Sequence, residues 1–201
     1  SVKRVFSSIK AIYNLAASEY GLDGKNPFSK VYFPETNDTK ARRPATEAEL
    51  SQIQSECTSL NDEIRWLIAL VSDTGMRLSE AAGLYWDDVK LDDGTPHVII
   101  QPNAHRRLKT ASSKRTIPVV GFSLWALKEA KTHATGPYVY PKYMKGTTCA
   151  ANSASAATNK WIKSLVNSDI SMHSLRHSMR DRLRSAQCPT EVIDQIGGWS
   201  S

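Results

Sequence analysis

Residues 173–186 read HSLRHSMRDRLRSA, and this stretch sets the expectations for the rest of the chain. Its apolar residues recur at helical spacing and predict a helix over 174–186 that buries Leu175, Met179 and Leu183. His173 and Arg176 lie three residues apart and share a helix face, and Arg180 lies one turn further along it. This face suits a phosphate, because arginine is a planar two-pronged donor and histidine can donate a hydrogen bond or move a proton. For this spacing alone, a solvated polar face is the favoured alternative.

The same stretch also has the spacing of a zinc-binding pair, since His173 and His177 are four residues apart. No acidic residue stands between them and no third ligand is evident, so we expect no metal and no cofactor. The segments outside this stretch are mostly helical. Periodicity and capping residues predict helices over 2–20, from the Thr46 capping box to about Cys57, from Asn61 to Gly75, and over 78–82, 123–133, 151–166 and 189–197.

Within 151–166 the expected buried stripe is Ala154, Ala157, Trp161 and Leu165. The period changes between the helices, and strands are expected over 86–91, 97–101 and 115–119. A turn at 92–94 separates the first two strands. The expected fold is therefore α+β and mainly α, with one small antiparallel sheet.

Net charge, the longest apolar run and the cysteines limit the classes of protein to which this chain can belong. The 201 residues carry a net charge of +6, which permits a polyanionic partner but equally fits solvated lysines. The longest apolar run, 66–71, is far shorter than the ~20 residues of a membrane span, and no leader opens the chain. With an apolar run this short, we expect no membrane partner. Three scattered cysteines form neither a disulfide framework nor a metal knuckle, so we expect a reducing cytoplasm.

Two further groups of residues draw attention. Arg77 follows an apolar helix directly and Glu80 follows three residues later, so a carboxylate can hold this arginine in place, in a functional site or simply at a helix end. The segment 105–118 contains no acid and includes Lys109 among small residues, which suits a loop that enters a DNA groove or attracts phosphates nonspecifically. Phosphate-binding loops, dinucleotide-binding loops and serine-nucleophile elbows are absent from the sequence.

Four segments, taken in order, resemble the tyrosine recombinases, most closely the integrases of phages and other mobile elements. They are 74–80 (TGMRLSE), 109–119 (KTASSKRTIPV), 173–177 (HSLRH) and 196–200 (IGGWS). The resemblance implies a helical catalytic domain over 46–201, a linker over 31–45 and the last helix of a core-binding domain over 1–30. It also implies site-specific DNA recombination by strand cleavage and rejoining through a 3′-phosphotyrosyl intermediate.

The resemblance assigns roles residue by residue. Arg77 and Arg176 would grip the scissile phosphate, His173 would hydrogen-bond it and assist proton movement, and Lys109 would protonate the leaving 5′ hydroxyl, with Lys114 as the alternative. Trp199 would offer its indole N–H to a phosphate oxygen, and Glu80 would support Arg77. Further candidates for DNA contact are Arg42, Arg43, Arg106, Arg107, Lys114, Arg115 and Arg180.

The family nucleophile is a tyrosine soon after the position of Trp199, but the last tyrosine of this chain is Tyr143. We therefore expect truncation before the nucleophile and an inactive fragment of an active enzyme. The expected partners are double-stranded DNA and further protomers, as a tetramer in the full protein, in the cytoplasm and nucleoid of a bacterial host. The alternative is a catalytically dead DNA-binding regulator of the same fold.

Overall fold

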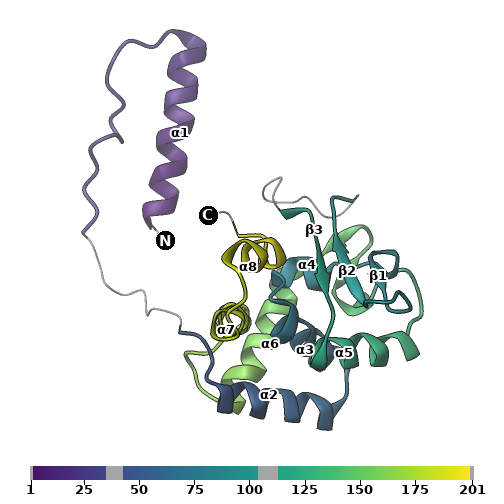
Figure 1. Cartoon of the computed structure of the whole chain (residues 1–201). Helices are drawn as coiled ribbons and strands as arrows, with labels where there is room; N and C mark the ends of the chain where they lie inside the picture. The colour runs from purple at the N-terminus through teal and green to yellow at the C-terminus, as the bar shows by residue number, and fades with distance from the viewer. Residues whose placement is uncertain (1, 35–42, 104–112, 200–201) are drawn as a thin grey trace. The chain divides into compact units, whose positions relative to one another are not determined.

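The computed structural model describes residues 2–34, 43–103 and 113–199, and the chain divides into two compact units, Ser1–Lys40 and Ala41–Ser201 (Figure 1). Each unit has its own internal contacts and is described separately. Among the described residues, no helix combines the length and the apolar character needed to cross a membrane.

The smaller unit contains the helix α1 (Val2–Tyr20), which agrees with the predicted helix over 2–20. The chain after this helix folds back along it. Asn26 Nδ2 donates to Asn14 Oδ1 at 2.6 Å, and the rings of Phe6 and Phe28 meet edge to face with centroids 6.3 Å apart. No residue of α1 is buried, so aromatic edges and a side-chain amide, rather than a closed core, hold this unit together.

The larger unit is built mainly from helices. They are α2 (Glu47–Leu60), α3 (Glu63–Thr74), α4 (Leu78–Ala82), α5 (Gly121–Thr132), α6 (Ala151–Leu165), α7 (Met172–Ser185) and α8 (Thr190–Gly197), with short 3₁₀ turns η1 (Trp86–Asp88) and η3 (Pro141–Tyr143). The antiparallel sheet β1 (Val89–Lys90), β2 (His97–Ile100) and β3 (Arg115–Pro118) has the strand order β1-β2-β3. A second antiparallel pair joins β4 (Met144–Lys145) to β5 (Thr148–Cys149). The expected mainly helical α+β class is confirmed, with two small sheets rather than one.

Helix α3 forms the centre of the core and packs against α2, α5, α6 and α7 (Figure 1). Its apolar run 66–71 has no polar face, and Leu67, Ile68 and Leu70 are each 0% exposed. A helix that is apolar on all sides has to be surrounded, because any exposed side would leave hydrocarbon in water. The centre of this unit thus follows directly from the sequence.

The junction between α2 and α3 corrects one expectation. Asn61 was expected to cap the start of α3, but it ends α2 in the left-handed region, with φ at 42°. Asp62 caps α3 instead, where its side chain accepts the backbone N–H of Arg65 at 3.1 Å. Asparagine tolerates the left-handed region better than most residues, and aspartate is a strong N-cap, so each residue takes the position that suits it. Helix α2 consequently runs three residues past Cys57.

Two further expectations were wrong in detail. Helix α6 buries Ala154, Thr158 and Ile162, whereas the expected Trp161 lies at the edge of that face and is half-buried beneath the Arg65 guanidinium, 4.7 Å from its ring. Ala157 and Leu165 are likewise half-buried. The predicted strand over 86–91 is mostly the turn η1, because only Val89 and Lys90 pair with β2. A strand exists only as far as its partner accepts hydrogen bonds.

Candidate active site

Helix α7 carries an exposed histidine and a buried arginine among the candidate site residues. Leu175 is 0% exposed and Met179 is 6% exposed, so the expected apolar face is buried, with Leu183 half-buried at its end. His173 is exposed, but Arg176 is only 5% exposed. The buried Arg176 guanidinium bonds to two other segments of the chain. Its Nη1 donates to the carbonyl of Gly75, and its Nη2 donates to that of Gly197 at 2.7 Å.

Arg77 lies at the turn between α3 and α4. Helix α3 ends at Gly75, whose φ of 61° is left-handed and favours glycine, and an added Cβ there would lie 3.2 Å from Met179 Sδ. Glu80, in the first turn of α4, accepts the Arg77 backbone N–H at 2.9 Å and Arg77 Nη1 at 2.8 Å. The second amino nitrogen, Nη2, donates to the carbonyl of Gly198 at 3.0 Å. Main chain and side chain of Arg77 are therefore both held by one carboxylate.

The end of α8 brings the two arginines together. Arg176 and Arg77 donate to the carbonyls of consecutive residues, Gly197 and Gly198. The indole of Trp199 lies next to them, with the guanidinium carbon of Arg176 4.3 Å from the ring centroid. A Cβ on Gly197 would overlap this indole, so a side chain there would displace the ring from the arginine. Three segments far apart in sequence thus converge on one small region.

Positive charge exceeds negative charge in this region. Burial alone would raise the pKa of Glu80, but the hydrogen bonds and charge of Arg115, together with hydrogen bonds from Arg77, outweigh burial and hold its pKa below the ordinary value. Burial, followed by the nearby charge of Arg77, lowers the pKa of Arg176 to about 10. An anion placed beside these groups would relieve the cost of burying Arg176 in its charged form.

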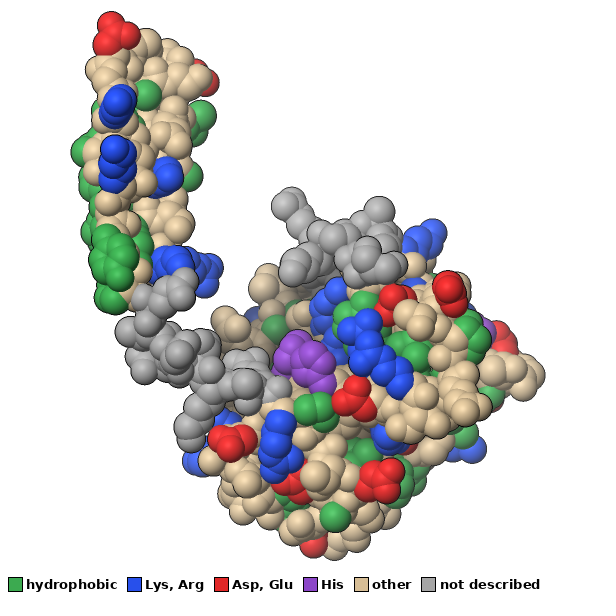
Figure 2. All heavy atoms as spheres, turned by 60° about the vertical axis from the view of Figure 1, so that its left-hand side comes forward, with side chains coloured by type: hydrophobic (Ala, Val, Ile, Leu, Met, Phe, Trp, Pro, Cys, Tyr) green, Lys and Arg blue, Asp and Glu red, His purple; other side chains and the backbone are tan. Residues whose placement is uncertain are grey.

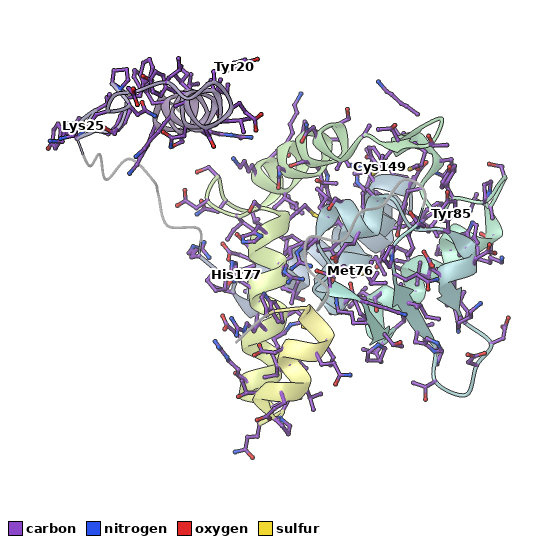
Figure 3. The ribbon with its side chains drawn as sticks, turned by 90° about the horizontal axis from the view of Figure 1, so that it is seen from above. Tyr20, Lys25, Met76, Tyr85, Cys149 and His177 are labelled. Atoms are coloured by element: carbon purple, nitrogen blue, oxygen red, sulfur yellow. The ribbon has the colours of Figure 1, made fainter. Side chains whose placement is uncertain are left out.

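Two histidines lie beside this cluster on α7. The rings of His173 and His177 meet edge to face, with centroids 4.5 Å apart. His177 projects from α7 in Figure 3, and Figure 2 shows histidine side chains at the surface with lysine and arginine side chains on the same face. Among the described residues, no group of three or more His, Cys, Asp or Glu side chains is arranged to hold a metal ion.

The basic residues that were expected to contact DNA fall into three groups. Arg42, Arg106, Arg107 and Lys109 lie outside the described residues. Lys114 is exposed. Three others are engaged within the protein: Arg43 pairs with Glu49 at 2.6 Å, Arg180 pairs with Asp194 at 3.1 Å and lies 4.8 Å from the Trp199 ring, and Arg115 pairs with Glu80 at 2.7 Å.

Arg115 departs furthest from the expectation for a DNA contact. Its side chain is 1% exposed, so its guanidinium is not presented at the surface. The residue stands in β3 opposite Ile100, which points it into the domain, and its buried charge is matched by Glu80. A basic residue in a strand that alternates buried and exposed positions is internal when it falls on the buried side, as it does here.

Sequence reasoning missed the backbone part of the site. The carbonyls of Gly75, Gly197 and Gly198 accept hydrogen bonds from the two arginines, and Ser113 Oγ accepts from Arg77 Nη1 at 3.4 Å. A glycine at the end of a helix is the sequence signal that could have indicated these acceptors, because a helix end leaves backbone carbonyls without helical partners. The residue that donates to such a carbonyl depends on tertiary contacts.

Comparisons with known proteins identify the family. Residues 44–201 match the phage integrase family. The chain is 29% identical over 142 residues to tyrosine recombinase XerC of Neisseria meningitidis, covering 67% of this chain and 43% of that protein. It is 28% identical over 144 residues to tyrosine recombinase XerD of Corynebacterium glutamicum, covering 68% of this chain and 44% of that protein. The chain therefore spans less than half the length of these curated relatives.

Solved structures show the same fold. An integrase of the Tn1549 transposon in complex with transposon right-end DNA superposes with a TM-score of 0.66 at 20% identity, covering 100% of this chain and 71% of that chain. A lambda integrase tetramer bound to a Holliday junction superposes with a TM-score of 0.67 at 18% identity, covering 99% of this chain and 58% of that chain. At these identities the likeness concerns the fold.

Proposed function

This chain belongs to the phage integrase family, and from that premise we propose that the protein containing it is a site-specific recombinase that cuts and rejoins DNA. The proposed reaction passes through a 3′-phosphotyrosyl intermediate and serves the integration or excision of a phage or another mobile element. A tyrosine hydroxyl attacks the scissile phosphorus, the bond to the 5′ oxygen breaks, and the 5′ hydroxyl leaves with a proton. Rejoining reverses these steps with a 5′ hydroxyl from another strand.

The observation that carries this proposal is the meeting of Arg77 and Arg176 at consecutive carbonyls. Arg77 Nη2 and Arg176 Nη2 lie 3.0 and 2.7 Å from the oxygens of Gly198 and Gly197. Two guanidinium groups held in this way are preorganised donors for the non-bridging oxygens of one phosphate. They would stabilise the charge that builds up in a pentavalent transition state, the kind of contribution that is commonly largest in catalysis.

Other residues complete the proposed chemistry. The exposed His173 would hydrogen-bond the phosphate and assist proton movement at the nucleophile. Trp199, stacked on Arg176, would offer its indole N–H to a phosphate oxygen. Lys109 would protonate the leaving hydroxyl, with Lys114 as the alternative, and Glu80 would hold Arg77. No metal enters this scheme, because protein cations and donors supply the positive charge.

The nucleophile is not among the tyrosines before Trp199 in this proposal. The last of the seven tyrosines, Tyr143, is 3% exposed and lies in the core, where burial raises its pKa to about 12. We accordingly propose that these 201 residues by themselves form no covalent adduct with DNA. A tyrosine in the continuation of the chain would supply the nucleophile.

The wider assembly is proposed from the relatives. Residues 1–30 would complete a core-binding domain, 31–45 would link it, and 46–201 would form the catalytic domain. Double-stranded DNA would be contacted by basic residues that include Arg42, Arg106 and Arg107, and further protomers would assemble on it as a tetramer. The lambda integrase that superposes on this chain is itself a tetramer on a Holliday junction. We place this reaction in the cytoplasm of a bacterial host.

Arg176→Ala in the full-length protein tests the function. The DNA is duplex selected by the wild-type protein from a random library, and the readouts are binding and formation of a covalent protein–DNA complex. We expect cleavage to fall by about 10²–10³-fold, the usual effect of losing one transition-state donor, with binding changed far less. Arg184→Ala is the matched control on the same helix, because the Arg184 side chain is 55% exposed.

The outcome separates the proposed enzyme from a DNA-binding regulator. A regulator would bind the selected duplex with and without Arg176 and would give no covalent complex in either form. Equal cleavage by the wild type and the Arg176 variant would contradict the proposed phosphate site. Binding by either kind of protein should weaken steeply as salt is raised, because phosphate contacts release counterions.

A further inference from the structure

Arg115 uses its guanidinium entirely within the protein. Nη2 donates to Glu80 Oε2 at 2.7 Å and Nη1 to Glu80 Oε1 at 3.3 Å, a bidentate pair with side chains 1% and 6% exposed. Nη1 also donates to the carbonyl of Ser113 at 2.8 Å, and Nε donates to the carbonyl of Ile196 at 2.8 Å. One side chain therefore joins α4, the start of β3 and the end of α8.

Each of these partners also bears on a residue of the proposed phosphate site. Glu80 Oε1 accepts Arg77 Nη1 at 2.8 Å, so the two arginines share one carboxylate. Ser113 Oγ accepts Arg77 Nη1 at 3.4 Å. Arg115 therefore bonds to two of the three residues that accept hydrogen bonds from the Arg77 guanidinium, Glu80 and Ser113.

The third partner leads to the other site arginine. Ile196 directly precedes Gly197, whose carbonyl accepts Arg176 Nη2 at 2.7 Å. The turn at Gly198 packs against Arg115 so closely that an added Cβ would lie 3.0 Å from Arg115 Nη1. The position of the α8 end, and with it the carbonyls that hold Arg77 and Arg176, is thus fixed against the Arg115 side chain.

We propose that Arg115 is a positioning residue that sets the separation and orientation of Arg77 and Arg176 for one phosphate. This inference rests on the proposed function, because it assigns a role at the same site. Arg115 does not itself touch the phosphate. It holds Glu80 on one side and the end of α8 on the other, so that the two phosphate-binding arginines keep a fixed relation.

Lysine cannot take over this role. Its ammonium group is a point charge that can neutralise Glu80, but it lacks the planar fork that meets both carboxylate oxygens while Nε reaches a carbonyl in another direction. Arg115→Lys therefore keeps the charge of the pair and removes the link to Ile196. A role in charge balance alone would survive this substitution, whereas a positioning role would not.

The test uses the 201-residue chain and tungstate, a tetrahedral oxyanion that serves as the phosphate probe. Proton–nitrogen NMR follows the arginine Nε–H and tryptophan indole N–H signals, with Arg77→Lys and Arg176→Lys used to assign the site arginines. Thermal unfolding is recorded for every variant. Arg182→Met is the matched control, because Arg182 also pairs with a carboxylate, Asp73 at 3.0 Å, without contacting Arg77 or Arg176.

In the wild type we expect saturable shifts of the Arg77, Arg176 and Trp199 signals. Arg115→Lys should remain folded and bind tungstate about tenfold or more weakly, because a displaced Arg77 or Arg176 would lose one charge-assisted hydrogen bond to the anion. Arg182→Met should bind within about twofold of the wild type, which is less than 0.5 kcal/mol. Arg115→Met, which also removes the charge, should bind no better than Arg115→Lys.

Two results would overturn the inference, and they are distinguishable. Wild-type affinity in Arg115→Lys, or an equal loss in Arg182→Met, would show that Arg115 has no specific positioning role while leaving the phosphate site intact. If the Arg77 and Arg176 signals of the wild type do not shift when tungstate is added, there is no phosphate site and the proposed function fails with it.

Discussion

Replacing Glu80 by glutamine removes the carboxylate on which this site depends. Glu80 accepts the backbone N–H of Arg77 at 2.9 Å and Arg77 Nη1 at 2.8 Å, and it pairs with Arg115 through contacts of 2.7 and 3.3 Å. Glutamine has nearly the same shape but no charge, and its amide nitrogen would face a guanidinium. The variant leaves the 1% exposed Arg115 as a buried, unmatched cation.

The magnitude follows from burial. Removing one partner of a buried ion pair lowers the free energy of unfolding by about 3–5 kcal/mol. For a domain of this size each kcal/mol corresponds to about 2–4 °C, so the midpoint of thermal unfolding should fall by roughly 6–20 °C. Asp194→Asn is the control, because its pair with Arg180 is more exposed, with side chains at 28% and 12%, and should contribute about 1 kcal/mol or less.

The pH dependence provides a second readout of the same prediction. The folded protein holds the pKa of Glu80 below its ordinary value, despite burial, through the hydrogen bonds and charge of Arg115 and through hydrogen bonds from Arg77. Its stabilising contribution is therefore fully present above the ordinary pKa of the carboxyl and is lost as pH falls through the folded-state pKa. Urea unfolding should show a large gap between wild type and Glu80→Gln near neutral pH that narrows in acid. A Glu80→Gln midpoint no lower than that of Asp194→Asn, or a gap independent of pH, would refute this reasoning.

Two further predictions concern single side chains elsewhere in the larger unit. A hydrogen bond from the Arg43 side chain, partly opposed by burial, lowers the pKa of Glu49 from 4.5 to about 2. Stability from this group should therefore be lost as pH falls between these values. Glu49→Gln should flatten that part of a curve of urea midpoint against pH, and an unchanged slope would contradict the role of this pair. Burial raises the pKa of the 0% exposed Cys57 thiol to about 12. In the native protein iodoacetamide should therefore label the half-buried Cys149 and Cys188 first, as measured by peptide mass spectrometry. Early labelling of Cys57 would contradict the packing of α2.

Local signals predicted most of the helices and the small three-stranded sheet. The helix stop at Gly75 and the capping box at Thr46 act over a few residues, and both appear in the structure as expected. Sequence reasoning failed where two neighbouring residues compete for one role, as Asn61 and Asp62 do at a helix junction. It also failed at η1, because the length of a strand is set by its partner rather than by its own residues.

The partners within the site could not be predicted for a related reason. Arg77 and the carbonyl that it contacts are 121 residues apart, and a backbone carbonyl carries no sequence signature. Arg115 was grouped with DNA contacts because it follows other basic residues, yet Glu80, 35 residues earlier, makes it an internal residue. The motifs indicated which charged residues are candidates for the site, whereas only the fold shows which of these charges are neutralised by a partner.

That distinction explains how the site can be both rigid and positively charged. Arg77 and Arg115 share the Glu80 carboxylate, whereas the carbonyls of Gly197 and Gly198, which accept from Arg176 and Arg77, are neutral. Neutral carbonyls orient a guanidinium without cancelling its charge, and each guanidinium has five N–H donors, so bonds on one edge leave others for a ligand. Burial, and after it the neighbouring charge of Arg77, lowers the pKa of Arg176 to about 10. A bound phosphate should raise that pKa again, so protonation of Arg176 and anion binding must favour each other.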